Sequence, residues 1–213
     1  MPQPSMVLND APTAEDTADQ TAELHRLRVR VDAGGPDSLR AAPALLERSI
    51  RAQELGADAD RLLALARRPS TGPELAGLLA ARVAEAQAIG LIQEVLRGGT
   101  QPDPGLVRMV AETAEFAYRR APQRVQARTS VALARLLVDR PAEARNFLVG
   151  LNTAAADVRS RVNVAAVRAF AEIELGDLTQ ARRLVDRAAL LDPAAGLLPL
   201  ARLAVEQAER RAG

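Results

Sequence analysis

Few side chains in this sequence are suited to chemistry. The chain has no Cys and no Lys, all 28 of its basic residues are Arg, and His25 is its only imidazole. These absences exclude cysteine nucleophiles, Schiff-base lysines, cysteine-bound zinc and disulfide frameworks. His25 follows a polar N-terminal segment and is expected to be a surface side chain. An enzyme built on this sequence would have to use Asp, Glu, Arg and Tyr118 alone.

The possible metal and phosphate sites are incomplete. Glu23 with His25, and Asp58 with Asp60, each supply two potential ligands, which is fewer than a metal site needs. The glycine-containing segment 97–100 lacks both the Lys and the spacing of a phosphate-binding loop. We therefore predict a protein that is not an enzyme and holds neither a metal nor a cofactor.

The charge distribution gives no strong reason to expect nucleic acid or a membrane as the partner. The net charge is +1, and the Arg doublets are interleaved with acids and lack the aromatic side chains on which bases stack. The first residues do not show the basic and then apolar pattern of a secretory signal. The longest apolar stretch, Leu75 to Ile92, is interrupted by Arg82, Glu85 and Gln87. We predict a cytoplasmic protein with no membrane contact, and nucleic acid is the less favoured partner.

The composition favours helices. The chain contains 44 Ala and 30 Leu but four aromatic residues, whereas strands prefer β-branched and aromatic side chains. Apolar residues recur at helical spacing over 38–55, 60–67, 74–96, 106–120, 122–138, 141–151, 157–175, 178–191 and 198–211. Segment 22–32 fits either a helix or a strand, and helix is favoured because no second strand is predicted nearby. The predicted fold class is all-α.

Four regions are predicted along the chain. They are an acidic disordered tail over 1–21, an N-terminal helical region over 22–97, a Pro/Gly linker over 98–105 and a C-terminal helical region over 106–213. The helix over 74–96 is apolar almost all round, so it should be the most buried element of the first half.

The C-terminal region contains an internal repeat. A shift of 37 residues aligns Arg124-Val125 with Arg161-Val162 and Ala144-Arg145 with Ala181-Arg182. Conservative pairs such as Leu136 and Ile173 fill the gaps between these matches. Two such amphipathic helices in each unit are typical of an antiparallel helix pair.

The second unit ends in a stretch that resembles a known repeat. Residues 176–193 begin with Gly-Asp, continue with small alanines at Ala181 and Ala188, and close with Leu-Asp-Pro. Gly176 can end a helix in the left-handed conformation, and Asp177 can cap the next helix. This pattern is similar to the second half of a tetratricopeptide repeat, although the period of 37 residues is longer than the usual period of about 34.

The resemblance implies an architecture and a binding surface. It covers about 122–193, and the helix over 198–211 would cap a short right-handed solenoid of stacked hairpins. The sequence Glu54-Leu55-Gly56 weakly echoes Glu174-Leu175-Gly176, which makes the N-terminal region a candidate for a degenerate part of the same array. Tetratricopeptide arrays bind peptides or helices in a concave groove lined by the first helix of each pair. The groove positions in this sequence are Gln126, Arg128, Thr129, Ser130, Arg159, Asn163 and Val167, with Leu133, Ala166 and Phe170 expected nearer the core.

The sequence leaves three functional hypotheses open. The favoured one is a non-catalytic scaffold or adaptor that binds a partner peptide or helix. The second is a regulatory helical domain that acts with a transcription regulator, similar to the activator segments of bacterial regulators. The third is an enzyme that uses only Asp, Glu, Arg and Tyr side chains.

Overall fold

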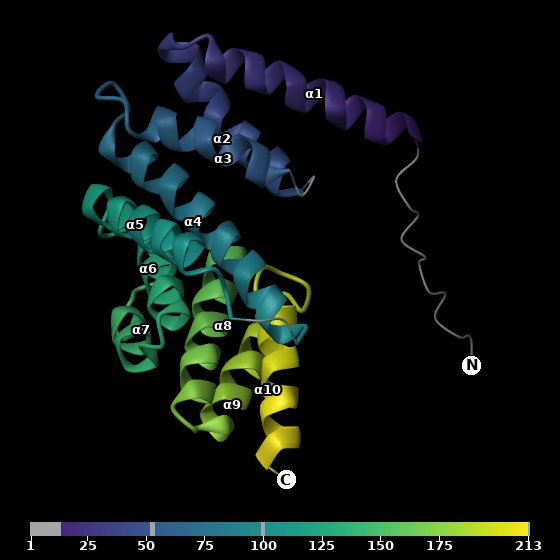
Figure 1. Ribbon diagram of the computed structural model, residues 1–213, viewed down its shortest axis with the longest axis vertical. Coiled ribbons are helices and arrows are strands. Elements are labelled where there is room, and N and C mark those ends of the chain that lie inside the picture. The colour runs from purple at the N-terminus through teal and green to yellow at the C-terminus, as the bar shows by residue number, and fades with distance from the viewer. Residues whose placement is uncertain (1–13, 52–53, 99–100, 213) are drawn as a thin grey trace.

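The computed structural model describes residues 14–51, 54–98 and 101–212, and in these ranges the chain forms helices joined by turns and loops (Figure 1). The helices in these ranges are α1 (Ala14–Asp32), α2 (Gly35–Arg51), α3 (Leu55–Ala66), α4 (Pro73–Leu96), α5 (Pro104–Arg120), α6 (Val125–Leu137), α7 (Pro141–Leu148), α8 (Val158–Glu174), α9 (Leu178–Ala189) and α10 (Leu198–Ala212). No strand occurs in them. The all-α prediction is confirmed, and segment 22–32 is a helix.

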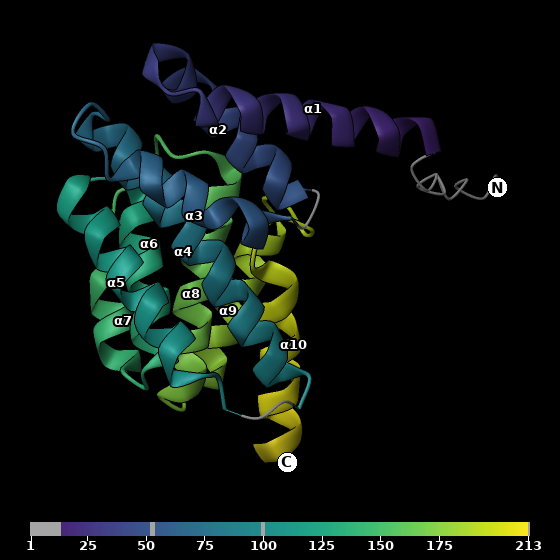
Figure 2. The same ribbon diagram turned by 45° about the horizontal axis from the view of Figure 1, so that its top comes forward.

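Helix α1 begins earlier than the sequence pattern predicts. It starts at Ala14, so 14–21 are helical although they fall within the predicted disordered tail. Half of the eight residues in this segment are Ala, Glu or Gln, which favour helices, and the other half are Asp or Thr. Its N-terminal turns project beyond α2 and α3 at one end of the molecule (Figures 1 and 2). The rest of the predicted tail, 1–13, lies outside the described residues.

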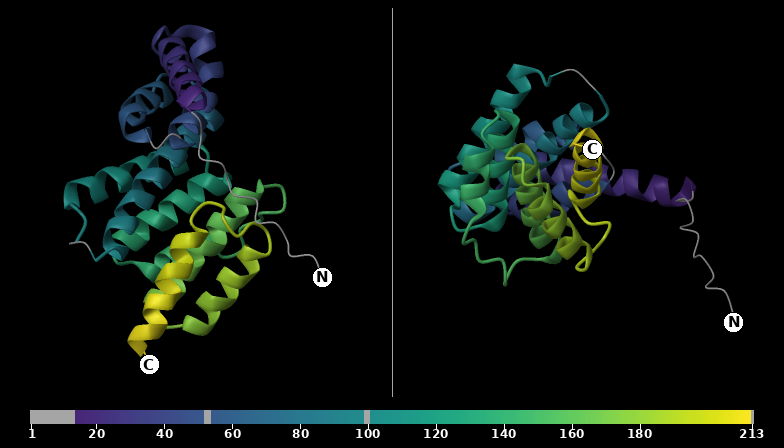
Figure 3. Two further views of the ribbon diagram at one scale, coloured as in Figure 1. Left: turned by 90° about the vertical axis from the view of Figure 1, so that its right-hand side faces the viewer. Right: turned by 90° about the horizontal axis from the view of Figure 1, so that it is seen from below.

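The helices pack in a regular order. Each helix contacts the next one along the chain, and α2, α4, α6, α8 and α10 also contact one another in succession. Helix α10 additionally contacts α4, so this row of alternate helices curves back on itself. Helices α8, α9 and α10 lie at the end of the molecule opposite α1 and α2 (Figures 1 and 3).

Helix α4 joins the two halves of the core. Its N-terminal half, including Leu79 and Val83, packs in the same cluster as α1–α3, while Ala88 and Leu91 pack with α5–α10. Because α4 also lies against α5 and α6, the Pro/Gly segment 98–105 does not separate two independent cores. By length and composition alone α4 could cross a membrane, but more than half of its most apolar 18-residue stretch is buried inside the molecule. That burial accounts for its apolar composition.

The backbone repeats with the period of 37 residues found in the sequence. Asp139 and Gly176 each follow the first helix of a pair, and both have positive φ angles, 56° and 83°. In the first unit the amide of Arg140 donates to the carbonyl of Arg135 at 2.9 Å. In the second, Asp177 donates to Glu172 at 2.8 Å. The two helix ends therefore have the same geometry.

The sequence pattern of the repeat predicts the cap at Asp177 correctly, but it does not predict the conformation at Gly56. The Asp177 side chain accepts a hydrogen bond from the Gln180 amide at 2.9 Å, which confirms the predicted cap of α9. Gly56, in contrast, lies within the first turn of α3 and has no positive φ angle. The echo at 54–56 therefore does not mark a helix end equivalent to Gly176, because the chain there begins a helix.

A buried carboxylate ties α1, α2 and α3 together. The side chain of Asp58 is fully buried and accepts hydrogen bonds from Arg28 at 2.9 Å, Arg61 at 2.8 Å and the Ser49 hydroxyl at 2.6 Å. Burial by itself raises the pKa of Asp58, but the hydrogen bonds from Arg28 and Ser49 outweigh it. The pKa of this carboxyl is therefore held below its usual value.

We expect Asp58→Asn to lower the free energy of unfolding by about 2 kcal/mol at neutral pH, because it removes charged hydrogen bonds. Since the folded pKa of Asp58 is lowered, its stabilising effect is complete above about pH 4 and is lost as the pH falls through the folded pKa. Urea unfolding at about pH 6 and about pH 3 should show a flatter pH dependence for the variant. Asp60→Asn, at an exposed neighbouring position, is the control, and equal effects of both substitutions would contradict the assignment.

Candidate functional site

An apolar pocket lies where α4, α6 and α8 end and α10 passes beside them. We call it the inner pocket, and its volume is about 420 Å³. Its apolar lining is Ile92, Val95, Leu96, Pro102, Leu136, Leu137, Pro141, Phe170, Ile173 and Ala204, and its polar lining is Gln101, Asp139, Glu174 and Arg211. Leu136 and Ile173 are repeat-equivalent residues of α6 and α8, so the repeat places matching side chains around one space.

The polar groups at the inner pocket favour positive charge. The last residues of α4, α6 and α8 line it, so the negative ends of three helix dipoles meet there. Two exposed carboxylates, Asp139 and Glu174, lie among the lining residues, against a single cation, Arg211. The arrangement suits a ligand that has both apolar groups and a positively charged group.

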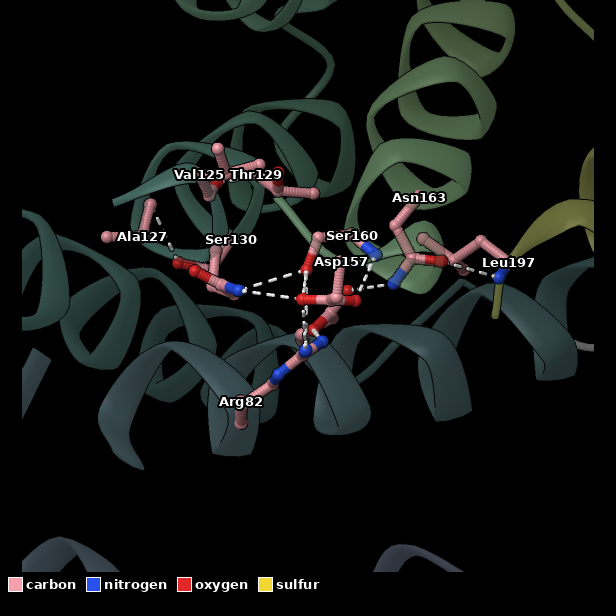
Figure 4. A network of polar contacts seen from close by, with 11 residues as sticks. Arg82, Val125, Ala127, Thr129, Ser130, Asp157, Ser160, Asn163 and Leu197 are labelled. Atoms are coloured by element: carbon pink, nitrogen blue, oxygen red, sulfur yellow. Dashed lines mark hydrogen bonds and ion pairs between the residues drawn. The ribbon is translucent and has the colours of Figure 1, made fainter. Parts of the chain in front are cut away.

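Further along the same helices, the space between α4, α6 and α8 is filled by a set of hydrogen-bonded side chains. This interior network consists of Arg82, Glu85, Gln126, Asp157, Ser160 and Asn163 (Figure 4). Arg82 pairs with the buried carboxylate of Glu85 at 2.8 Å, and the amide of Asn163 donates to the same carboxylate. The network connects helices that are far apart in the sequence.

The two ends of the network are fixed by further contacts. The backbone amide of Leu197 donates to Asn163 Oδ1 at 2.9 Å, and this holds the start of α10 against α8. At the other end, Gln126 donates to the Ser160 hydroxyl at 2.9 Å. Partial desolvation raises the pKa of the half-exposed Asp157, but hydrogen bonds from the Ser160 hydroxyl and amide, with the charge of Arg82, hold this pKa below its usual value. The network therefore keeps its ionised groups paired.

The predicted groove residues do not share one open surface. Thr129, Ser130, Asn163 and Val167 are buried. Helix α4 packs against α6, and its Arg82 and Glu85 side chains reach Ser160 and Asn163 of α8. The hydroxyl groups of Thr129 and Ser130 donate to backbone carbonyls of their own helix (Figure 4).

The remaining predicted groove residues have three different surroundings. Gln126 belongs to the interior network, Arg128 lines a separate hollow between α5 and α7, and Arg159 is exposed. Of the residues expected nearer the core, Leu133 and Ala166 are buried, and Phe170 lines the inner pocket.

In the sequence, Arg82 and Glu85 stand out only as interruptions of an apolar run. A charged pair three residues apart on a buried helix needs polar partners from other helices, so the pair itself was a signal for the network. The identity of those partners could not be read from the sequence, because Ser160 and Asn163 lie 78 residues further along the chain.

The described residues provide little for metal chemistry. Within them no group of three or more His, Cys, Asp or Glu side chains is placed to hold a metal ion. The Asp58 carboxylate already accepts hydrogen bonds from two Arg side chains and Ser49. Its oxygens are therefore engaged in holding α1, α2 and α3 together.

Comparisons with known proteins give no match. No protein-family model matches the chain, and neither a curated protein nor a solved structure matches it. The site is therefore interpreted from its own geometry and electrostatics.

Proposed function

We propose that this chain is a non-catalytic interaction scaffold that binds a partner peptide or helix through the inner pocket. The observation that carries the proposal is a concave apolar space lined by alternate helices of a repeating array. Half-buried side chains such as Ile92, Leu136 and Ile173 leave apolar surface there without a cover among the described residues. Burial of such surface by a partner side chain is favourable by about 25 cal/mol per Å².

The partner segment has a definite chemistry in this proposal. It presents two or three apolar side chains at helical spacing, and it carries an Arg or Lys that reaches Asp139, Glu174 and the helix C-termini. We assign the array to the tetratricopeptide-like class on the basis of its helix pairs and its period of 37 residues. We also propose that it acts in the cytoplasm.

Selection of displayed peptides on the full chain tests this function. We expect enriched sequences to be amphipathic and to contain a basic residue, with Kd values in the micromolar range. Ile173→Glu should weaken their binding at least tenfold, because it places a charge among apolar lining residues. Leu190→Glu is the matched control, because Leu190 is 87% exposed just after α9 and does not line the pocket.

Two outcomes would refute the proposal. One is that selection enriches no sequence class. The other is that the enriched peptides bind the Ile173→Glu and Leu190→Glu variants equally well while both variants retain the thermal midpoint of the parent protein.

A further inference from the structure

A second concave surface lies between α5, α6 and α7. We call it the outer hollow, and it is lined by Tyr118, Arg128, Glu143, Asn146 and Phe147, with a volume of about 330 Å³. It shares no lining residue with the inner pocket. An inference about it therefore does not depend on the proposed function of the inner pocket.

Three side chains that line the outer hollow have hydrogen-bond donors without an acceptor within the described part of the chain. The Nε atom of Arg128 is buried and has no hydrogen-bond partner there. The hydroxyl of Tyr118 and the amide of Asn146 likewise make no hydrogen bond to the described residues, and both line the same space. A guanidinium group, a phenol and an amide therefore line one hollow, and together they form a donor set suited to a carboxylate.

The carboxylate of Glu143 also lines the outer hollow, but its charge is already engaged. Its two oxygens lie 3.4 Å from Arg135 and 3.4 Å from Arg140. Arg128 makes no ion pair with another described residue, so its positive charge is available to an incoming anion.

One wall of the outer hollow is aromatic. The rings of Tyr118 and Phe147 pack edge to face, with centroids 5.5 Å apart and planes at 78°. This wall can cover an apolar side chain next to the bound carboxylate. An anion without an apolar neighbour would leave the wall unused.

We propose that the outer hollow binds a peptide carboxylate, with the guanidinium of Arg128 as its main partner and an adjacent apolar side chain packed on Phe147. Tyr118 and Asn146 donate the remaining hydrogen bonds. The carboxylate can come from the end of a peptide chain or from an acidic side chain, and the hollow binds either through the same donors.

NMR titration of the full-length labelled protein tests this proposal. The ligands are acetyl-Leu-Phe with a free carboxylate, the same dipeptide as its C-terminal amide, acetyl-Leu-Glu amide, and inorganic phosphate. We expect saturable shifts of the Arg128 Nε–H and Asn146 amide signals with the carboxylate ligands in the millimolar range, and at least tenfold weaker responses to the amide. The free-carboxylate and glutamate ligands separate the terminal from the side-chain source.

Two variants accompany the titration. Arg128→Gln should abolish the response, whereas Arg159→Gln, at an exposed position of α8, should leave it intact. If Arg128→Gln disturbs the amide spectrum as a whole, Tyr118→Phe replaces it, and that variant should weaken carboxylate binding several-fold. Equal responses to the carboxylate and the amide, a response to phosphate as strong as that to the carboxylates, or no shift at about 10 mM ligand would each overturn the proposal.

Discussion

Replacement of Ala181 by Glu is expected to lower the free energy of unfolding by about 3–5 kcal/mol. Ala181 is fully buried on the face of α9 that packs against α8, and its repeat equivalent Ala144 is also fully buried. A Glu side chain would overfill this contact and bury a charge that has no partner. Urea unfolding followed by circular dichroism measures the change.

Two comparison variants separate charge from volume at this position. Arg183→Glu introduces the same residue at an exposed site of α9 and should change stability by less than about 1 kcal/mol. Ala181→Leu overpacks the contact without a charge and should cost about 1–3 kcal/mol. A thermal midpoint of Ala181→Glu equal to that of the parent would show that α9 does not pack in this register.

The second large effect is expected from Asn163→Asp. In the folded protein the amide of Asn163 donates to the buried carboxylate of Glu85, so the substitution places two carboxylates in contact. They cannot both be ionised there at a low energetic cost. We expect a loss of about 3 kcal/mol of stability at neutral pH, measured by chemical denaturation.

The sign of the pH dependence of stability shows whether repulsion between two carboxylates causes the loss in the Asn163→Asp variant. One proton is shared between the two carboxyl groups of the variant, so their apparent pKa is raised above the ordinary carboxyl value. The destabilisation is then complete at high pH and is relieved as the pH falls through that raised pKa, so stability rises between about pH 8 and about pH 5. Asn152→Asp, at an exposed turn, is the control, and parallel pH profiles for the two variants would contradict the network.

Gly196 lies close to Asn163 of the interior network, and its lack of a side chain is consistent with the hydrogen bonds of Asn163 described above. It has a positive φ angle of 56°, and a Cβ atom at this position would lie 1.8 Å from Asn163 Oδ1. A side chain there would displace Asn163 from both Glu85 and the Leu197 amide. The glycine therefore allows the loop before α10 to approach α8 closely.

The sequence by itself determined the helical class, most helix boundaries and the repeat of 37 residues. These features depend on local physical chemistry, namely helix propensity, apolar periodicity and capping, as at Gly176 and Asp177. The burial of Ala144 and Ala181 also followed from their spacing.

The candidate site was decided by the tertiary structure. Periodicity shows which face of α6 or α8 is apolar, but it does not show that α4 packs against α6. It also does not show that the C-terminal ends of α4, α6 and α8 leave the inner pocket open between them. The resemblance to tetratricopeptide repeats places Thr129 and Asn163 on an open surface, whereas Thr129 is buried and the buried side chain of Asn163 is hydrogen-bonded to the buried carboxylate of Glu85. Contacts between residues about 78 positions apart, such as Asn163 with Glu85, depend on how the helix pairs stack, and no local pattern in the chain encodes that stacking.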